Sequence, residues 1–210
     1  DYSSGATLAY AVLAQAPPGT FRGAISLGFC PDLPLAKPLC REGGLRWTGS
    51  DARGGYRFAP VTDHALPWIV LQGAVDQVCA PERARVFVQA VPGAEIVPLP
   101  GVGHGFGVTG RWLPQLRDAM ARLATQDSAA RPAVDSSVRD LPLVPLATHR
   151  PSEDPALAVI LSGDGGWAGL GRQAAGGLGD SGVPVVGWSS PGYFWRPRTA
   201  EGVAADPARG

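Results

Sequence analysis

The chain has 210 residues, enough for one large domain or two small ones. Its 18 basic and 18 acidic residues balance to a net charge of +0, which argues against a nucleic-acid-binding protein and against a polybasic membrane-surface protein. We recognise no signal peptide and no apolar run long enough to form a transmembrane segment.

The first residues, Asp1-Tyr2-Ser3-Ser4-Gly5, form a candidate nucleophile elbow. They match the serine and the last glycine of the G-x-S-x-G pattern, with Asp1 in the place of the first glycine. In this motif a strand turns sharply into a helix and exposes the serine hydroxyl. Residues 5–16 are small and apolar, which predicts the helix. No strand precedes the motif, so we expect the chain to be a piece of a longer protein.

Strands and helices alternate after the elbow. Buried strands are predicted at 21–28 and 68–72, a further strand at 94–99, and helices at 81–91 and about 112–123. Residues 29–66 are rich in glycine, proline and charge, and we interpret them as a long surface excursion. The alternation predicts an α/β fold with a mostly parallel sheet.

A second unit of the same kind follows residues 126–137, whose Ala-, Ser-, Asp- and Pro-rich composition indicates a linker. Strands are predicted at 141–146, 156–161 and 183–188. A helix is predicted at 168–180, weakened by five glycines at about 1 kcal/mol each relative to alanine. The tail from about Arg196 is expected to fray. We therefore predict two partial modules, 1–125 and 138–210.

Three residues stand in the chain order of an α/β-hydrolase triad. Ser3 lies on the elbow, Asp76 follows the strand at 68–72, and His104 follows the strand at 94–99. The carboxyl ends of parallel strands meet at one edge of a sheet, so these side chains are expected to converge. His104 would take the proton of Ser3, and Asp76 would hold the imidazole in the required tautomer. The fold class is therefore predicted as α/β-hydrolase-like.

Other residues compete for these roles. His64, Asp32 and Asp51 are alternatives, although none follows a convincing buried strand, and Ser4 is the alternative nucleophile.

The backbone N–H of Ser4 is the first candidate oxyanion donor. The turn Ser162-Gly163-Asp164-Gly165-Gly166-Trp167, with Gly165 and Gly166 as donors, could be an oxyanion loop or an ordinary tight turn. It could also supply donors to Ser3 in a composite site.

The cysteines leave two interpretations open. Cys30 and Cys40 bracket a proline-rich loop and could close it as a disulfide in an oxidising compartment, or all three cysteines could be buried thiols. The 3 histidines are isolated from one another and from any CxxC pattern, so we expect no metal site and no cofactor.

Several segments resemble the VirJ/AcvB family of bacterial virulence-associated proteins. Those of the second unit are Leu161–Trp167, Gly182–Trp188 and the Tyr-Phe-Trp run at 193–195. The segments around Ser3, 29–32, 76–79 and 103–106 are similar to the first half of the longer, AcvB-type members.

The resemblance implies tandem hydrolase-like modules and a periplasmic location. This chain would then hold the end of the first module and the start of the second, whose own nucleophile, acid and histidine would lie beyond Gly210. Some members are associated with type IV secretion, and some hydrolyse the aminoacyl ester of aminoacyl-phosphatidylglycerol. The implied partner is a lipid or small ester substrate. The alternative is a non-catalytic module that binds a secretion-system or envelope protein.

Overall fold

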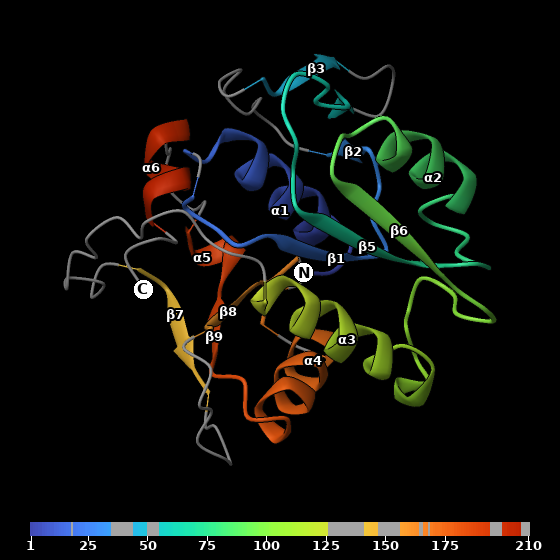
Figure 1. Cartoon of the computed structure of the whole chain (residues 1–210), viewed down its shortest axis with the longest axis vertical. Coiled ribbons are helices and arrows are strands. Elements are labelled where there is room, and N and C mark those ends of the chain that lie inside the picture. Colours follow the sequence, from blue (N-terminus) through green and yellow to red (C-terminus); the bar gives the residue numbers. More distant parts are fainter. Residues whose placement is uncertain are drawn as a thin grey trace.

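The computed structural model describes residues 1–17, 19–34, 44–49, 55–125, 141–146, 156–163, 166–167, 169–193 and 199–206. Strands and helices alternate through most of these ranges, which confirms the predicted α/β class (Figure 1). The strands are β1 (Ala24–Leu27), β2 (Asp32–Leu33), β3 (Arg46–Gly49), β4 (Tyr56–Ala59), β5 (Trp68–Gly73), β6 (Ala94–Leu99), β7 (Leu143–Pro145), β8 (Ala158–Leu161) and β9 (Val185–Trp188). The helices are α1 (Ser4–Gln15), α2 (Pro81–Gln89), the 3-10 helix η1 (Thr109–Arg111), α3 (Leu113–Ala124), α4 (Gly169–Asp180), α5 (Ser190–Tyr193) and α6 (Ala200–Ala205).

The first sheet is parallel, in the order β1–β5–β6. Its central strand, β5, is buried along its whole length, which explains its continuous apolar run. Ala24 lies opposite Trp68, and Trp68 lies opposite Ala94. All three strands therefore end at one edge, and the loops that carry Asp76 and His104 leave the sheet there.

A short strand stub precedes the elbow, where the sequence had shown no strand. Tyr2 forms a parallel bridge with Leu27 at the end of β1. The Leu27 N–H donates to the Asp1 carbonyl at 2.6 Å, and the Ser3 N–H donates to the Leu27 carbonyl at 2.9 Å. These bonds place Ser3 at the same sheet edge as the other two candidate residues.

The second small sheet has the order β7–β9–β8, with β9 parallel to β8 and antiparallel to β7. The glycine-rich helix predicted beside it forms as α4. One reason for its glycines is the close approach of α3, because a Cβ on Gly177 would lie 2.4 Å from the Leu113 side chain. Close packing of this kind offsets the low helix propensity of glycine.

Residues from both predicted modules share one hydrophobic core. Leu27, Ile69 and Trp112 belong to the same buried cluster as Ile160 and Leu178. Figure 1 shows α3 beside α4 in the same part of the molecule. The Leu161 N–H donates to the Asp1 carboxylate, so β8 lies against the elbow. The predicted linker, 126–137, lies outside the described residues.

Residues 29–66 contain a third sheet that the sequence analysis missed. It is antiparallel, in the order β2–β4–β3. Its strands have two to four residues, too few to show an alternating pattern. Phe58 of β4 packs edge-on against Tyr10 of α1, within an aromatic cluster that includes Trp68.

The expectation of a frayed tail is wrong for residues 200–205, which form α6. Thr199 caps this helix, because its hydroxyl accepts the Gly202 N–H at 3.1 Å. Val203 packs against a small core cluster that contains Val12 of α1. The cap and this contact hold the helix in place despite its alanine- and glycine-rich sequence.

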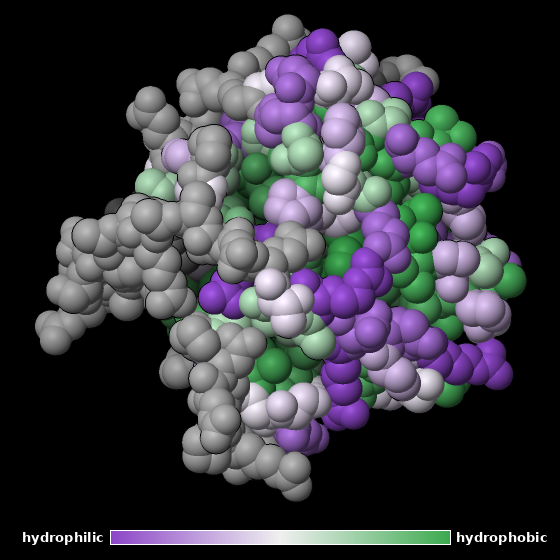
Figure 2. All heavy atoms as spheres, viewed as in Figure 1, coloured by the Kyte–Doolittle hydropathy of each residue, from purple (hydrophilic) through white to green (hydrophobic). Residues whose placement is uncertain are grey.

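The face seen in Figure 2 mixes hydrophilic and apolar side chains, with hydrophilic ones gathered over α3. This distribution fits the amphipathic pattern of α3, which buries Leu116, Ala119 and Leu123. Among the described helices, none combines the length and the apolar character needed to cross a membrane.

Candidate active site

The elbow has the strained backbone that its motif predicts. Ser3 has φ 54° and ψ −124°, a conformation that non-glycine residues rarely adopt. Helix α1 begins at the next residue. A Cβ on Gly5 would lie 2.9 Å from the Leu161 carbonyl oxygen, so glycine is required where α1 passes β8.

The loop that carries Asp76 is joined to the loop that carries His104. The Val75 N–H donates to the Val102 carbonyl at 3.1 Å. A Cβ on Gly73 would lie 2.4 Å from that same carbonyl oxygen, so only glycine permits this approach. The two loops thus leave the sheet side by side.

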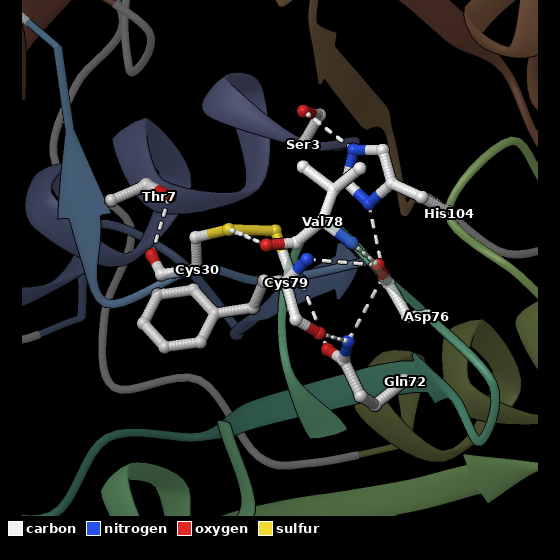
Figure 3. Close-up of a disulfide and its surroundings, with 9 residues drawn as sticks. Ser3, Thr7, Cys30, Gln72, Asp76, Val78, Cys79 and His104 are labelled. Atoms are coloured by element: carbon white, nitrogen blue, oxygen red, sulfur yellow. Dashed lines mark hydrogen bonds and ion pairs between the residues drawn. A yellow bond between two sulfur atoms is a disulfide. The ribbon is translucent and has the colours of Figure 1, made fainter. Parts of the chain in front are cut away.

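Ser3, His104 and Asp76 form a continuous hydrogen-bonded chain (Figure 3). The Ser3 Oγ lies 3.1 Å from His104 Nε2, and His104 Nδ1 lies 2.9 Å from Asp76 Oδ2. The Asp76 side chain is fully buried, and the His104 side chain is 16% exposed. This geometry is the one that base-assisted attack by a serine requires.

Several donors surround the buried Asp76 carboxylate. Its Oδ1 accepts the backbone N–H groups of Val78 and Cys79, each at 2.8 Å. Its Oδ2 accepts from Gln72 Nε2 at 3.2 Å in addition to His104. These bonds compensate for the removal of a charge from water.

The His104 ring is held by its neighbours. Its centroid lies 5.3 Å from that of Tyr2, and Tyr2 packs edge-on against Phe106 at 5.8 Å. The Trp112 indole donates to the Phe106 carbonyl at 2.9 Å, which anchors the loop to the residue that directly precedes α3. The imidazole is therefore fixed by packing as well as by hydrogen bonds.

Two of the alternative candidates, His64 and Asp32, do not join this chain. His64 bonds to Asp63 at 3.0 Å and is 44% exposed. Asp32 is an exposed residue of β2. Asp51 lies outside the described residues. Ser4 is the first residue of α1, one position past the residue that bonds to His104.

The glycine loop after β8 lies at the elbow, but one of its two predicted donors is engaged elsewhere. The Gly166 N–H donates to the Gly163 carbonyl at 3.0 Å, so that amide is engaged within the turn and does not point to Ser3 as an oxyanion donor. Gly165 lies outside the described residues. Among the described glycines of this loop, Gly163 meets the elbow, since a Cβ there would lie 3.1 Å from Ser4 Oγ.

The proposed Cys30–Cys40 disulfide is wrong. The structure joins Cys30 to Cys79, with their Cα atoms 4.9 Å apart. Cys30 follows β1 and Cys79 follows β5, and the parallel pairing of these strands brings the two residues together. Cys40 lies outside the described residues. The bond ties the loop that carries Asp76 to the loop that follows β1 (Figure 3).

Asp76, Cys79 and His104 offer three potential metal-ligand atoms within 4.8 Å of one another. The Cys79 sulfur, however, is bonded to Cys30. The two remaining side chains are engaged with each other as acid and imidazole, which favours the triad interpretation of this cluster.

The candidate serine lies on a strained turn that follows a parallel strand segment. The acid and the histidine lie on the loops after β5 and β6, at the same edge of the sheet. This arrangement places the protein among the α/β-hydrolase-like folds. Residues 155–209 match the VirJ family model, described as "Bacterial virulence protein (VirJ)". The chain is thus VirJ-like over this segment, which confirms the resemblance of the motifs in the second unit.

One solved structure shows a partial likeness, the "Crystal structure of the Esterase domain from Rhodothermus marinus protein". Its TM-score is 0.29 at 15% sequence identity, and the match covers 51% of this chain and 51% of that chain. The chain thus spans about half the length of that domain. No curated protein matches the chain.

Proposed function

We propose that this protein is a serine hydrolase that cleaves an ester. Ser3 is the nucleophile, His104 the general base, and Asp76 the residue that orients the imidazole. The observation that carries the proposal is the bonded chain from Ser3 Oγ through His104 to Asp76, at 3.1 Å and 2.9 Å. A serine hydroxyl is a weak nucleophile without such a base.

The proposed reaction has two halves. Ser3 Oγ attacks the acyl carbon while His104 Nε2 takes its proton, and His104 then returns a proton to the leaving alcohol. Water activated by His104 next hydrolyses the acyl-enzyme. The Ser4 N–H, at the start of α1, supports the developing oxyanion, and the Gly163 backbone approaches the same elbow.

For the substrate, we propose an aminoacyl ester of a lipid, with aminoacyl-phosphatidylglycerol as the specific candidate. The support is the VirJ match together with exposed apolar side chains on the loops of the site. Val75 and Val78, which flank Asp76, are 56% and 69% exposed, and Val108, past His104, is 58% exposed. Exposed valines beside a catalytic site suit an apolar substrate.

A periplasmic location and a role in virulence are parts of the same proposal. The Cys30–Cys79 disulfide supports an oxidising compartment, because such bonds are rare in the cytosol. The VirJ match covers residues 155–209 and supports the role in virulence.

The test is hydrolysis of p-nitrophenyl butyrate, and of lysyl-phosphatidylglycerol in vesicles with release of lysine as the readout. We expect turnover of both substrates by the wild-type protein and no turnover by Ser3→Ala. The control is Ser181→Ala, which should keep turnover, because the Ser181 hydroxyl donates to the Gly177 carbonyl of α4 and not to a residue of the site. Turnover that survives Ser3→Ala would refute the proposal. A folded protein with no turnover would favour a non-catalytic module that binds a secretion-system or envelope partner.

A further inference from the structure

A polar side chain lies in the most buried strand of the fold. Gln72, in β5, is only 1% exposed, and the strand is buried along its whole length. A buried amide costs free energy unless its donors and its acceptor all find partners. The sequence signal is a glutamine that ends an apolar run, four residues ahead of the acid.

The partners of Gln72 fix the orientation of its amide. Its Oε1 accepts the Phe29 N–H at 3.0 Å. Its Nε2 donates to the Cys79 carbonyl at 2.9 Å and to Asp76 Oδ2 at 3.2 Å. One donor and two acceptors match the amide in only one of its two orientations, so the N–H group faces the acid (Figure 3).

Gln72 therefore contacts the same carboxylate oxygen that receives the His104 Nδ1–H. The other oxygen is fixed by the Val78 and Cys79 backbone. Without Gln72, His104 would be the one donor left to Oδ2 among the described residues, and the Cys79 carbonyl would lose its side-chain partner. Both ends of the acid loop, Asp76 to Cys79, would then be held less firmly.

The disulfide forms a second tie on the same loop. It joins Cys79 to Cys30, whose carbonyl accepts the Thr7 hydroxyl at 2.8 Å. Thr7 belongs to α1, the helix that begins directly after Ser3. The acid loop is thus linked to the helix of the nucleophile through one covalent bond and one hydrogen bond.

We propose that Gln72 is a positioning residue of the triad, whose amide holds the Asp76 carboxylate in line with His104. Its effect on turnover rests on the proposed function, whereas its effect on the Asp76–His104 hydrogen bond does not. Misalignment should slow proton transfer from Ser3 without weakening the binding of substrate. We therefore expect a lower kcat at nearly constant KM.

The test uses Gln72→Met, which keeps the length of the side chain and removes its hydrogen bonds. The matched control is Tyr10→Phe. Tyr10 is equally buried, donates to the Ala59 carbonyl and accepts the Val61 N–H, each at 3.0 Å, and bonds to no triad residue. Each variant is measured for kcat and KM on p-nitrophenyl butyrate. The proton NMR spectrum is also searched for the downfield His104 Nδ1–H resonance, assigned by its loss in His104→Gln.

In Gln72→Met, kcat should fall about 10- to 100-fold, with the His104 resonance shifted or broadened beyond detection. Tyr10→Phe should keep both at wild-type values. An unchanged resonance in Gln72→Met would overturn the proposal whatever the activity. If the wild-type protein shows no Ser3-dependent turnover, the proposed function fails and the resonance alone decides the role of Gln72.

If Gln72→Met does not fold, Gln72→Glu replaces it. That side chain keeps an acceptor for the Phe29 N–H and places a carboxylate, instead of an N–H, beside Asp76 Oδ2. The same loss of kcat and the same change in the resonance are expected. Wild-type values for both in folded Gln72→Glu would overturn the proposal.

Discussion

Replacement of Asp76 by asparagine tests the proposed role of the acid with almost no change in shape. The backbone N–H groups of Val78 and Cys79 require an acceptor, so the asparagine oxygen should take the place of Oδ1. Its NH₂ group would then face His104 Nδ1 and Gln72 Nε2, which both donate at present. The imidazole would turn to the tautomer that carries its proton on Nε2, and that nitrogen could not accept the Ser3 proton.

The expected loss is about 10³- to 10⁴-fold in kcat, as for the same change in serine proteases. At 1.36 kcal/mol for each factor of ten, this corresponds to about 4–5.5 kcal/mol of transition-state stabilisation. The assay is turnover of p-nitrophenyl butyrate. Asp63→Asn is the matched control, because Asp63 makes a similar hydrogen bond to the exposed His64 at 3.0 Å. An Asp76→Asn protein with more than a tenth of wild-type kcat would refute this reasoning.

Three further predictions concern stability, and urea denaturation checks each of them. Gly28 has φ +63°, and a Cβ there would lie 3.2 to 3.5 Å from the side chains of Phe106, Asp76 and His104. Gly28→Ala should therefore lower the free energy of unfolding by about 1–2 kcal/mol and slow turnover. Unchanged stability of the variant would contradict this prediction. The Cys30–Cys79 bond spans 49 residues, so its removal by paired serine substitutions should lower the free energy of unfolding by about 4 kcal/mol. The control, Cys40→Ser, should keep the bond, as checked by peptide mass mapping without reduction. Burial raises the pKa of Tyr10 to about 12, above its ordinary 10.0, so the unfolded chain loses this proton first and stability should fall as the pH rises from about 10 to 12. Tyr10→Phe should remove that slope, and an identical pH profile in the variant would count against it.

The triad arrangement could be predicted because its signals are local. Asp76 and His104 each follow a predicted strand, Ser3 stands directly before a predicted helix, and parallel strands must end at a common edge. Asp1 in the place of the usual glycine did not prevent the elbow. Ser3 adopts its strained conformation because the Tyr2–Leu27 bridge and the start of α1 fix the backbone on both sides.

The features that the sequence analysis missed depend on contacts between distant residues. The Cys30–Cys79 pairing follows from the register of β1 against β5, which cysteine spacing does not encode. The sheet β2–β4–β3 consists of strands too short for a periodic signal. Gln72 shows its role only when the loops around it are in place.

The packing between the two predicted units could not be predicted from the sequence either. Their described residues share a core. β8 meets the elbow through Leu161, and the loop after β8 meets it through Gly163. The division into modules at 1–125 and 138–210 stays a prediction. So does the composite site, in which the loop after β8 serves Ser3.

The central claim is that His104 and Asp76 activate Ser3, and covalent labelling tests it most directly. A fluorophosphonate probe reacts with a serine only when a base has activated it. We predict a single adduct on Ser3, located by peptide mass spectrometry, and its loss in Ser3→Ala and in His104→Ala. A folded protein that stays unlabelled, or that carries the adduct on another serine, would contradict the account.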